Sequence, residues 1–132
     1  MKNIQRFMIV DDDPLNNSLC KFLVGKVVTN IEIKDFLLPI EGLNYIQTIY
    51  NSSNSNCPTI LLLDINMPIL TGWDFLDEFA KMGKHIHQQF IIYIVSSSID
   101  FSDIEKANAN IFVKEYVTKP LSLSIIKEMV AC

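Results

Sequence analysis

The sequence predicts an α/β fold in which a five-stranded parallel sheet lies between two layers of helices. Short apolar runs alternate with longer segments of helical periodicity along the 132 residues, so that five strand-then-helix units follow one another. The run Ile60–Leu63 is continuously hydrophobic, as a central parallel strand that is buried on both faces should be. Neither repeats nor linkers interrupt the alternation, which is typical of one doubly wound domain with three layers, α/β/α.

Two helices and the first strands are predicted before Ile60. Phe7–Val10 is a short buried strand, and Asp13 followed by Pro14 marks a helix start with Asp13 as the N-cap. Ile31–Ile33 alternates in polarity like a strand. The first helix presents an apolar face of Leu15, Leu19, Phe22 and Leu23, and the second presents Leu43, Ile46, Ile49 and Tyr50.

Two further strands and three helices are predicted in the second half of the chain. Strand Phe90–Val95 ends at a run of serines, and a fifth strand lies within Ile111–Thr118. Ser102 and Glu105 have the spacing of a capping box, which predicts the start of a short fourth helix. The last helix is Leu121–Val130. The third helix has an apolar face of Trp73, Phe75, Leu76 and Phe79.

The histidines and cysteines show no pattern of a metal site. His85 and His87 lie in Met82–Gln89, which we expect to be an extended, solvent-exposed loop, like the polar segment Asn51–Pro58. The cysteines are odd in number and lack a metal-ligand spacing, which predicts free thiols in a reducing compartment. They are Cys20, Cys57 and Cys132.

Composition excludes two broad classes of protein. The net charge is −4 and no stripe of Lys and Arg is present, so we expect no nucleic-acid binding. The longest apolar runs, such as Phe90–Val95, are far shorter than the ~20 residues that a bilayer span requires. The first apolar run is too short for the core of a signal peptide. The sequence therefore predicts a cytoplasmic protein that makes no membrane contact.

Polar residues follow four of the five predicted strands at the point where each strand ends. In open parallel sheets, ligands bind outside the carboxyl ends of the strands, where the strand order reverses. We therefore expect these side chains to lie together and to be the functional ones. They are Asp11, Asp12 and Asp13 after the first strand, Asp64 after the third, Ser96 after the fourth, and Lys119 with Pro120 near the end of the fifth.

Carboxylates gathered at one edge of a sheet require a counter-charge. Each pair at about 4 Å costs roughly 1 kcal/mol in water-like surroundings and about 4 kcal/mol at an effective dielectric of 20. Mg²⁺ suits one or two carboxylates with a backbone carbonyl and retained waters. Lys119 would add a fixed positive charge and Ser96 a hydroxyl. This set is what formation of an acyl phosphate on an aspartate needs.

The sequence resembles the response-regulator receiver domains of two-component signalling, which have a flavodoxin-like (βα)5 fold. The resemblance covers essentially the whole chain, from the first strand to the last helix. Each motif is weak alone, but together they are very specific. The matching segments are MIVDDDP (Met8–Pro14), LLLDINMPILTGWDFL (Leu61–Leu76), IVSSS (Ile94–Ser98) and YVTKPL (Tyr116–Leu121).

The resemblance implies a role for each matching residue. Asp64 would be the phospho-acceptor, and Asp11 and Asp12 the acidic pair that positions Mg²⁺, with Asp12 the more direct ligand. Asn66 would present its backbone carbonyl to the metal, whereas Asp13 fits the helix cap better. The remaining implied roles fall to Met67, Pro68 and Gly72 in the loop after the acceptor, to Ser96 and Tyr116 as switch residues, to the catalytic Lys119, and to Pro120 in a cis bond.

The implied function is that of a phosphorylation switch. A histidine kinase or a phosphotransfer protein donates a phosphoryl group to Asp64 in a Mg²⁺-dependent reaction, and Ser96 and Tyr116 then rearrange. The surface of the fourth helix, fifth strand and fifth helix changes, and a downstream protein or a second copy binds it through the last two β-α units. Residues 1–132 would form one receiver domain without an output domain. Its only catalysis would be self-phosphorylation from small phosphodonors and self-dephosphorylation.

Other readings stay open at the level of sequence. A receiver-like scaffold that binds partners without being phosphorylated would have the same fold. Phosphatases of the haloacid-dehalogenase type also use an aspartate after a buried strand, but they want a second acid two residues later, where this chain has Asn66. A role as phosphodonor lacks a histidine on an amphipathic helix face. Ser96 stands where threonine is commoner, and it keeps the hydroxyl.

Overall fold

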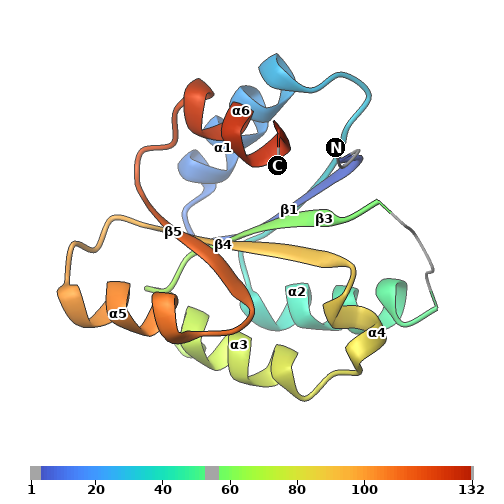
Figure 1. Cartoon of the computed structure of the whole chain (residues 1–132), viewed down its shortest axis with the longest axis vertical. Coiled ribbons are helices and arrows are strands. Elements are labelled where there is room, and N and C mark those ends of the chain that lie inside the picture. The colour runs from blue at the N-terminus through green and yellow to red at the C-terminus, as the bar shows by residue number, and fades with distance from the viewer. Residues whose placement is uncertain (1–3, 53–56, 132) are drawn as a thin grey trace.

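Five parallel strands form one sheet in the order β2-β1-β3-β4-β5 (Figure 1). The structure is a computed structural model that describes residues 4–52 and 57–131. The order reverses between β1 and β3, which is the doubly wound arrangement that the sequence predicts, so the predicted α/β fold is confirmed. The strands are β1 (Arg6–Val10), β2 (Glu32–Phe36), β3 (Thr59–Leu63), β4 (Phe90–Ser96) and β5 (Val113–Thr118).

Helices cover both faces of the sheet. In Figure 1, α1 and α6 lie above the sheet, whereas α2, α3, α4 and α5 lie below it. The helices are α1 (Pro14–Val27), α2 (Pro39–Tyr45) with the π-helical turn η1 (Ile46–Tyr50), α3 (Gly72–Ala80), α4 (Lys84–His87), α5 (Phe101–Ala109) and α6 (Leu123–Ala131). None of the helices in the described parts of the chain is both long and apolar enough to cross a membrane.

The central strand β3 divides the core into two halves. All five of its residues are buried. Leu61 and Leu63 pack into the core under α2, α3 and α5, while Ile60 and Leu62 pack into the core under α1 and α6. Successive side chains of a strand point to opposite faces, so a strand covered on both sides needs an unbroken hydrophobic run. This is the physical reason for the run that marks β3 in the sequence.

The structure confirms one predicted helix start and corrects another. Asp13 caps α1, because its carboxylate accepts a hydrogen bond from the backbone N–H of Leu15 at 3.0 Å. The predicted capping box of Ser102 and Glu105 is wrong. Helix α5 begins two residues earlier, with Asp100 as its N-cap, and the backbone N–H of Ser102 donates to that carboxylate at 3.0 Å.

The segment Met82–Gln89 is not the solvated loop that the sequence suggests. It contains the short helix α4, and Ile86 and Gln89 are buried. The Gln89 amide donates to the backbone carbonyl of Tyr50 at 2.9 Å, which ties α4 to η1. Ile86 explains the difference, since one apolar residue between two histidines is enough to anchor a single turn without giving a periodic signal.

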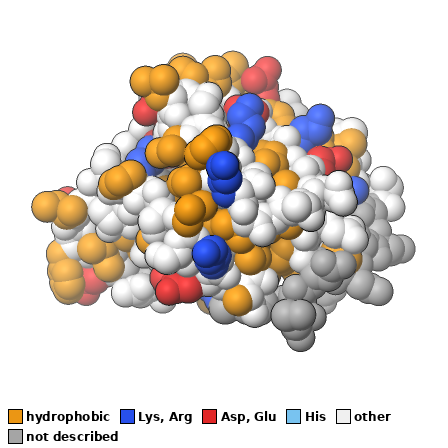
Figure 2. Space-filling view, turned by 90° about the horizontal axis from the view of Figure 1, so that it is seen from above, with side chains coloured by type: hydrophobic (Ala, Val, Ile, Leu, Met, Phe, Trp, Pro, Cys, Tyr) orange, Lys and Arg blue, Asp and Glu red, His pale blue; other side chains and the backbone are white. Residues whose placement is uncertain are grey.

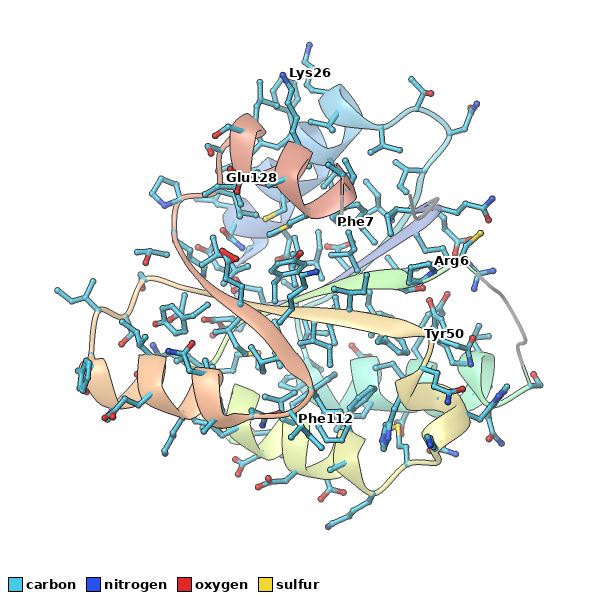
Figure 3. The ribbon with its side chains drawn as sticks, in the orientation of Figure 1. Arg6, Phe7, Lys26, Tyr50, Phe112 and Glu128 are labelled. Atoms are coloured by element: carbon cyan, nitrogen blue, oxygen red, sulfur yellow. The ribbon has the colours of Figure 1, made fainter. Side chains whose placement is uncertain are left out.

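The two histidines of this segment have different surroundings. His85 is exposed, as expected. His87 is half-buried, and its Nε2 lies 2.7 Å from the backbone carbonyl oxygen of Phe79. Its ring also packs against Phe112, with the two centroids 4.6 Å apart, below the sheet where Figure 3 labels Phe112. The prediction of a solvated position is therefore wrong for His87.

Smaller differences concern the ends of elements. Strand β2 continues to Phe36, because that residue pairs with Val10 at the end of β1. The second helix begins at Pro39, four residues before its first predicted apolar position, Leu43. Of the predicted loop Asn51–Pro58, residues 53–56 lie outside the described residues, and so does Cys132.

Candidate functional site

The carboxyl ends of four strands bring the predicted polar residues together. Asp11 follows β1 and Asp64 follows β3, at the point where the strand order reverses. Ser96 ends β4 and Lys119 follows β5. The backbone N–H of Lys119 donates to the carbonyl oxygen of Ser96 at 2.9 Å, and the backbone N–H of Asp64 donates to that of Val10 at 3.0 Å. The hydrogen bonds between neighbouring parallel strands therefore hold these residues next to one another at the carboxyl edge of the sheet.

Three carboxylates meet at this edge. Asp11, Asp12 and Asp64 each place an oxygen within 4.8 Å of the other two. Asp11 and Asp64 are only 2% and 5% exposed, while Asp12 is exposed. Two of the three carboxylates are therefore buried, and the third, that of Asp12, is open to solvent. A group of this kind attracts a cation, because like charges at such distances repel each other strongly when water is excluded.

Lys119 supplies a positive charge beside the same carboxylates. Its Nζ lies 2.8 Å from Asp11 Oδ2 and 3.9 Å from Asp64 Oδ1, and its side chain is 18% exposed. Burial lowers the pKa of Lys119, but the hydrogen bond to Asp11 and the two carboxylate charges outweigh burial and raise it above its ordinary value. Lys119 is therefore a fixed ammonium group that touches both buried aspartates.

Arg6 lies at the opposite end of the sheet from the carboxylate cluster. Arg6 is at the amino end of β1, where its guanidinium carbon is 5.7 Å from the centroid of the Tyr50 ring. Figure 3 labels both side chains at the right of the sheet, opposite the end where the strands terminate. In the part of the chain that the structure describes, Lys119 is the cation in contact with Asp11 and Asp64.

Asp64 has a strongly perturbed acidity. Burial and then the neighbouring Asp11 charge raise the pKa of Asp64 to about 6, while Lys119 and a hydrogen bond from the backbone N–H of Asn66 oppose the rise. That hydrogen bond is long, at 3.4 Å, and the Asn66 side chain is exposed. At neutral pH the carboxylate is still mostly ionised, as a nucleophile must be.

Asp11 is held by more partners than any sequence motif suggested. Its Oδ1 accepts the backbone N–H of Asp13 at 2.9 Å, and its Oδ2 accepts the Asn16 amide at 2.8 Å. The buried Asn17 amide donates to the Asp11 backbone carbonyl at 3.1 Å. Sequence reasoning missed both asparagines. Their position in the first turn of a helix after an acidic run is visible in the sequence, but it does not show which amide reaches Asp11.

Gly72 is required by a close approach between two pieces of backbone. A Cβ at this position would lie 2.5 Å from the carbonyl oxygen of Asp64 and 2.7 Å from the Cα of Ile65. The backbone N–H of Gly72 donates to the Ile65 carbonyl at 3.0 Å. The loop after Asp64 therefore folds back tightly on the strand end. Of its two other predicted residues, Met67 is buried and Pro68 is exposed.

The same loop contains a strained turn that the sequence did not reveal. Ile69 has a φ of 70°, and the backbone N–H of Leu70 donates to the carbonyl of Pro68 at 2.7 Å. A hydrogen bond across one central residue with positive φ is the rarer, strained form of γ-turn. The Ile69 side chain is 102% exposed, so it contributes no packing that would offset this strain.

Ser96 and Tyr116 are linked through Ser98. Ser96 is fully buried, and its hydroxyl oxygen accepts the backbone N–H of Ser98 at 3.1 Å. The Tyr116 hydroxyl donates to the Ser98 carbonyl at 2.6 Å, and the Ser98 hydroxyl donates to Asp103 of α5 at 2.9 Å. Ser98 thus connects the two predicted switch residues to the first turn of α5. The position of Ser98 two residues after Ser96 does not by itself indicate this connecting role in the sequence.

Comparison with known proteins gives the family. The response regulator receiver domain family matches residues 7–131, which is nearly the whole chain. The chain belongs to this family. No curated protein matches it.

Solved structures of other receivers have the same fold. A two-component response regulator from Cytophaga hutchinsonii is 28% identical, with 98% of each chain covered and a TM-score of 0.84. A response regulator receiver protein from Dyadobacter fermentans is 25% identical, covers 95% of this chain and 94% of its own, and gives a TM-score of 0.81. The phosphorylated cyanobacterial phytochrome response regulator RcpA is 22% identical, and the match covers 97% of this chain and 89% of RcpA with a TM-score of 0.73.

The acidic site of this receiver fits a magnesium ion. The cluster found among the described residues offers carboxylate oxygens alone, from Asp11, Asp12 and Asp64. Hard oxygen donors around an open position are what Mg²⁺ prefers, since it retains several waters, and a softer metal would favour His or Cys. The Lys119–Pro120 peptide bond is cis, as the resemblance to the family implies. The individual roles of the site residues remain predictions.

Proposed function

We propose that this receiver accepts a phosphoryl group on Asp64 in a Mg²⁺-dependent reaction. One observation carries the proposal: the Lys119 ammonium lies 2.8 Å from Asp11 and 3.9 Å from Asp64, two members of a cluster of three carboxylates. An ammonium and acidic metal ligands next to a buried carboxylate are what a phosphoryl group on that carboxylate needs. Membership of the receiver family supports the same reaction.

The transfer itself is a displacement at phosphorus. An oxygen of the Asp64 carboxylate forms a bond to phosphorus, while the bond from phosphorus to the donor breaks and its electron pair leaves with the donor. When the donor is a phosphohistidine, the departing ring nitrogen keeps that pair and can take up a proton. Bound Mg²⁺ would offset negative charge on the phosphoryl oxygens. Lys119 would offset further charge, and the Ser96 hydroxyl could donate a hydrogen bond to a phosphoryl oxygen.

The surroundings of the pocket favour a protein as the physiological donor, namely a histidine kinase or a phosphotransfer protein. Four large apolar side chains are strongly exposed in the loops and first helical turns that follow β1, β3 and β4. They are Leu15 (80%), Ile69 (102%), Ile99 (83%) and Phe101 (70%). Figure 2 shows hydrophobic side chains at the left end of the molecule, where the strands terminate. An apolar rim suits a protein surface that covers the pocket and excludes water.

The output of the switch would be a change in the surface of α5, β5 and α6. A new phosphoryl group adds about −1.5 to −2 charges if it behaves like other protein phosphates. A move of Ser96 toward that group would disturb its bond to the Ser98 N–H, and Ser98 in turn holds Tyr116 and Asp103. The result is a population shift between two packings, read by a downstream protein or by a second copy of this chain.

Intact mass spectrometry tests the proposal. Incubation with Mg²⁺ and acetyl phosphate should add one phosphoryl group to the wild-type protein, with acetate as the leaving group. The Asp64→Asn variant should remain unmodified. Asp13→Asn is a matched control, because asparagine is also a good N-cap and position 13 lies outside the carboxylate cluster, so this variant should still be labelled.

An unmodified wild-type protein would contradict the proposal if Mg²⁺ binding is shown by calorimetry in the same buffer. The receiver would then act as a scaffold that binds its partners without phosphorylation. Labelling of Asp64→Asn to the wild-type extent would also contradict it, because the phosphoryl group would then reside on another residue.

A further inference from the structure

One oxygen of Asp11 already has two strong donors. Lys119 Nζ and Asn16 Nδ2 both lie 2.8 Å from Asp11 Oδ2. The other oxygen, Oδ1, accepts the backbone N–H of Asp13 at 2.9 Å. The orientation of the Asn16 amide follows from chemistry, because an ionised carboxylate only accepts and the NH₂ end must face it. The Asp11 carboxylate is thus satisfied by groups of the chain itself.

The hydrogen-bond donors of the chain would compete with a metal ion for the oxygens of the Asp11 carboxylate. A carboxylate oxygen has about two lone-pair positions, and at Oδ2 both are occupied. A cation bound by Asp12 and Asp64, or a water in its coordination shell, needs an acceptor position on Asp11. One of the present donors must then move or share its acceptor.

Asn16 is the donor that can leave most easily. The N–H of Asp13 belongs to the backbone that leads into α1. Lys119 carries the charge that Asp11 and Asp64 both need. Asn16 is neutral and half-buried in the first turn of α1, so its amide can turn toward water at a modest cost.

We propose that Asn16 competes with Mg²⁺ and its waters for Asp11 Oδ2, and that this competition lowers the affinity of the receiver for the metal. The inference rests on the proposed function, since it concerns the same metal site. Asn16 here is a positioning residue that acts through Asp11. Because it sits on α1, metal binding is also coupled to the first turn of that helix.

Nuclear magnetic resonance tests the release of Asn16 directly. The side-chain NH₂ signals of Asn16 should shift when Mg²⁺ is added to metal-free protein, because their hydrogen bond to Asp11 is broken or shared. Asn17 is an internal control, since its amide donates to the Asp11 backbone carbonyl, which the metal does not need, and its signals should move much less. Large shifts for Asn17 with none for Asn16 would overturn the inference.

Calorimetry gives the second readout. Asn16→Leu keeps a similar side-chain volume without the donor, and it should bind Mg²⁺ about three- to tenfold more tightly than the wild type, the range expected for the net contribution of one hydrogen bond. Ser18→Ala, at an exposed position on the same helix, should bind like the wild type. Damage to the pocket would weaken binding, so tighter binding separates competition from a merely structural role.

Equal or weaker Mg²⁺ binding by a folded Asn16→Leu variant would overturn the inference while the proposed function stands. Circular dichroism establishes that the variant is folded, and if Asn16→Leu does not fold, Asn16→Ala is measured in its place with the same expectation. If the wild-type protein binds no Mg²⁺ at all, both the inference and the metal-dependent part of the proposed function fail. The wild-type titration therefore distinguishes the two failures.

Discussion

At the scale of single residues, Asp64 combines two properties that oppose each other. It is 5% exposed and shares its pocket with Asp11 and Asp12, so its ionised form is destabilised. The acceptor role that we propose for Asp64 requires an ionised carboxylate, and the Lys119 charge favours this form by lowering the pKa of Asp64. The residue is therefore a source of strain in the metal-free protein, which a cation would relieve.

This strain predicts a pH-dependent effect of Asp64→Asn on stability. The folded-state pKa of about 6 lies above the ordinary value of 3.8, so between these values the folded protein binds more protons than the unfolded one. The contribution of Asp64 to the free energy of unfolding therefore falls as pH rises from about 4 to about 6. In EDTA at pH 7, urea unfolding should give the variant a free energy of unfolding about 3 kcal/mol above the wild type.

At pH 3.5 the two proteins should be nearly equally stable, because Asp64 is then protonated in the folded state and mostly protonated in the unfolded state. An advantage of the variant that is the same at pH 3.5 and pH 7 would contradict a raised pKa at this position.

Ile69 offers a second test at the residue scale. Its φ of 70° is costly for a β-branched residue, and its exposed side chain makes no compensating contact. Ile69→Gly should leave the free energy of unfolding unchanged or higher. The control Ile111→Gly, at another exposed isoleucine with negative φ, should lose about 0.5–1 kcal/mol through chain entropy.

Chemical denaturation of the two variants should therefore differ by about 1–2 kcal/mol, the cost of a left-handed conformation for a residue with a Cβ. Equal losses in both would show that the turn at Ile69 carries no strain.

At the scale of elements, the junction between β3 and α3 depends on Gly72. A Cβ there would meet the backbone of Asp64 and Ile65 at 2.5 and 2.7 Å, and backbone cannot yield as a flexible side chain can. Gly72→Ala should lower the free energy of unfolding by about 3 kcal/mol or more. It should also weaken Mg²⁺ binding, because the clash displaces Asp64.

Gly25 gives the matched control in thermal and urea unfolding. It lies within α1, is exposed, and a Cβ there would have nothing within 4 Å. Gly25→Ala should raise the stability by about 1 kcal/mol, since alanine favours helices over glycine. A Gly72→Ala variant as stable as Gly25→Ala would refute the close approach.

The elements also show which features a sequence reveals. The continuous run of β3 and the Asp13–Pro14 helix start are local patterns with one physical cause each, and both predictions were correct. The start of α5 was misplaced because both Asp100 and Ser102 are good caps, and only the backbone geometry decides between them. Helix α4 was missed because it is a single turn anchored by Ile86.

At the scale of the whole molecule, the parallel topology brings most of the site residues together. Strand order alone predicts that residues after β1, β3, β4 and β5 share one edge, and the structure places Asp11, Asp64, Ser96 and Lys119 there. Partners that depend on side-chain direction, such as Asn16 and Ser98, could not be predicted, because sequence spacing does not determine which amide or hydroxyl reaches the pocket.

The most direct test of the central claim locates the phosphoryl group within the chain. The protein is phosphorylated with Mg²⁺ and acetyl phosphate, reduced with borohydride, digested and sequenced by mass spectrometry. Reduction converts an aspartyl phosphate to homoserine, and we predict homoserine at position 64. Homoserine at another aspartate, or none at all in protein shown to bind Mg²⁺, would contradict the assignment of Asp64 as the acceptor.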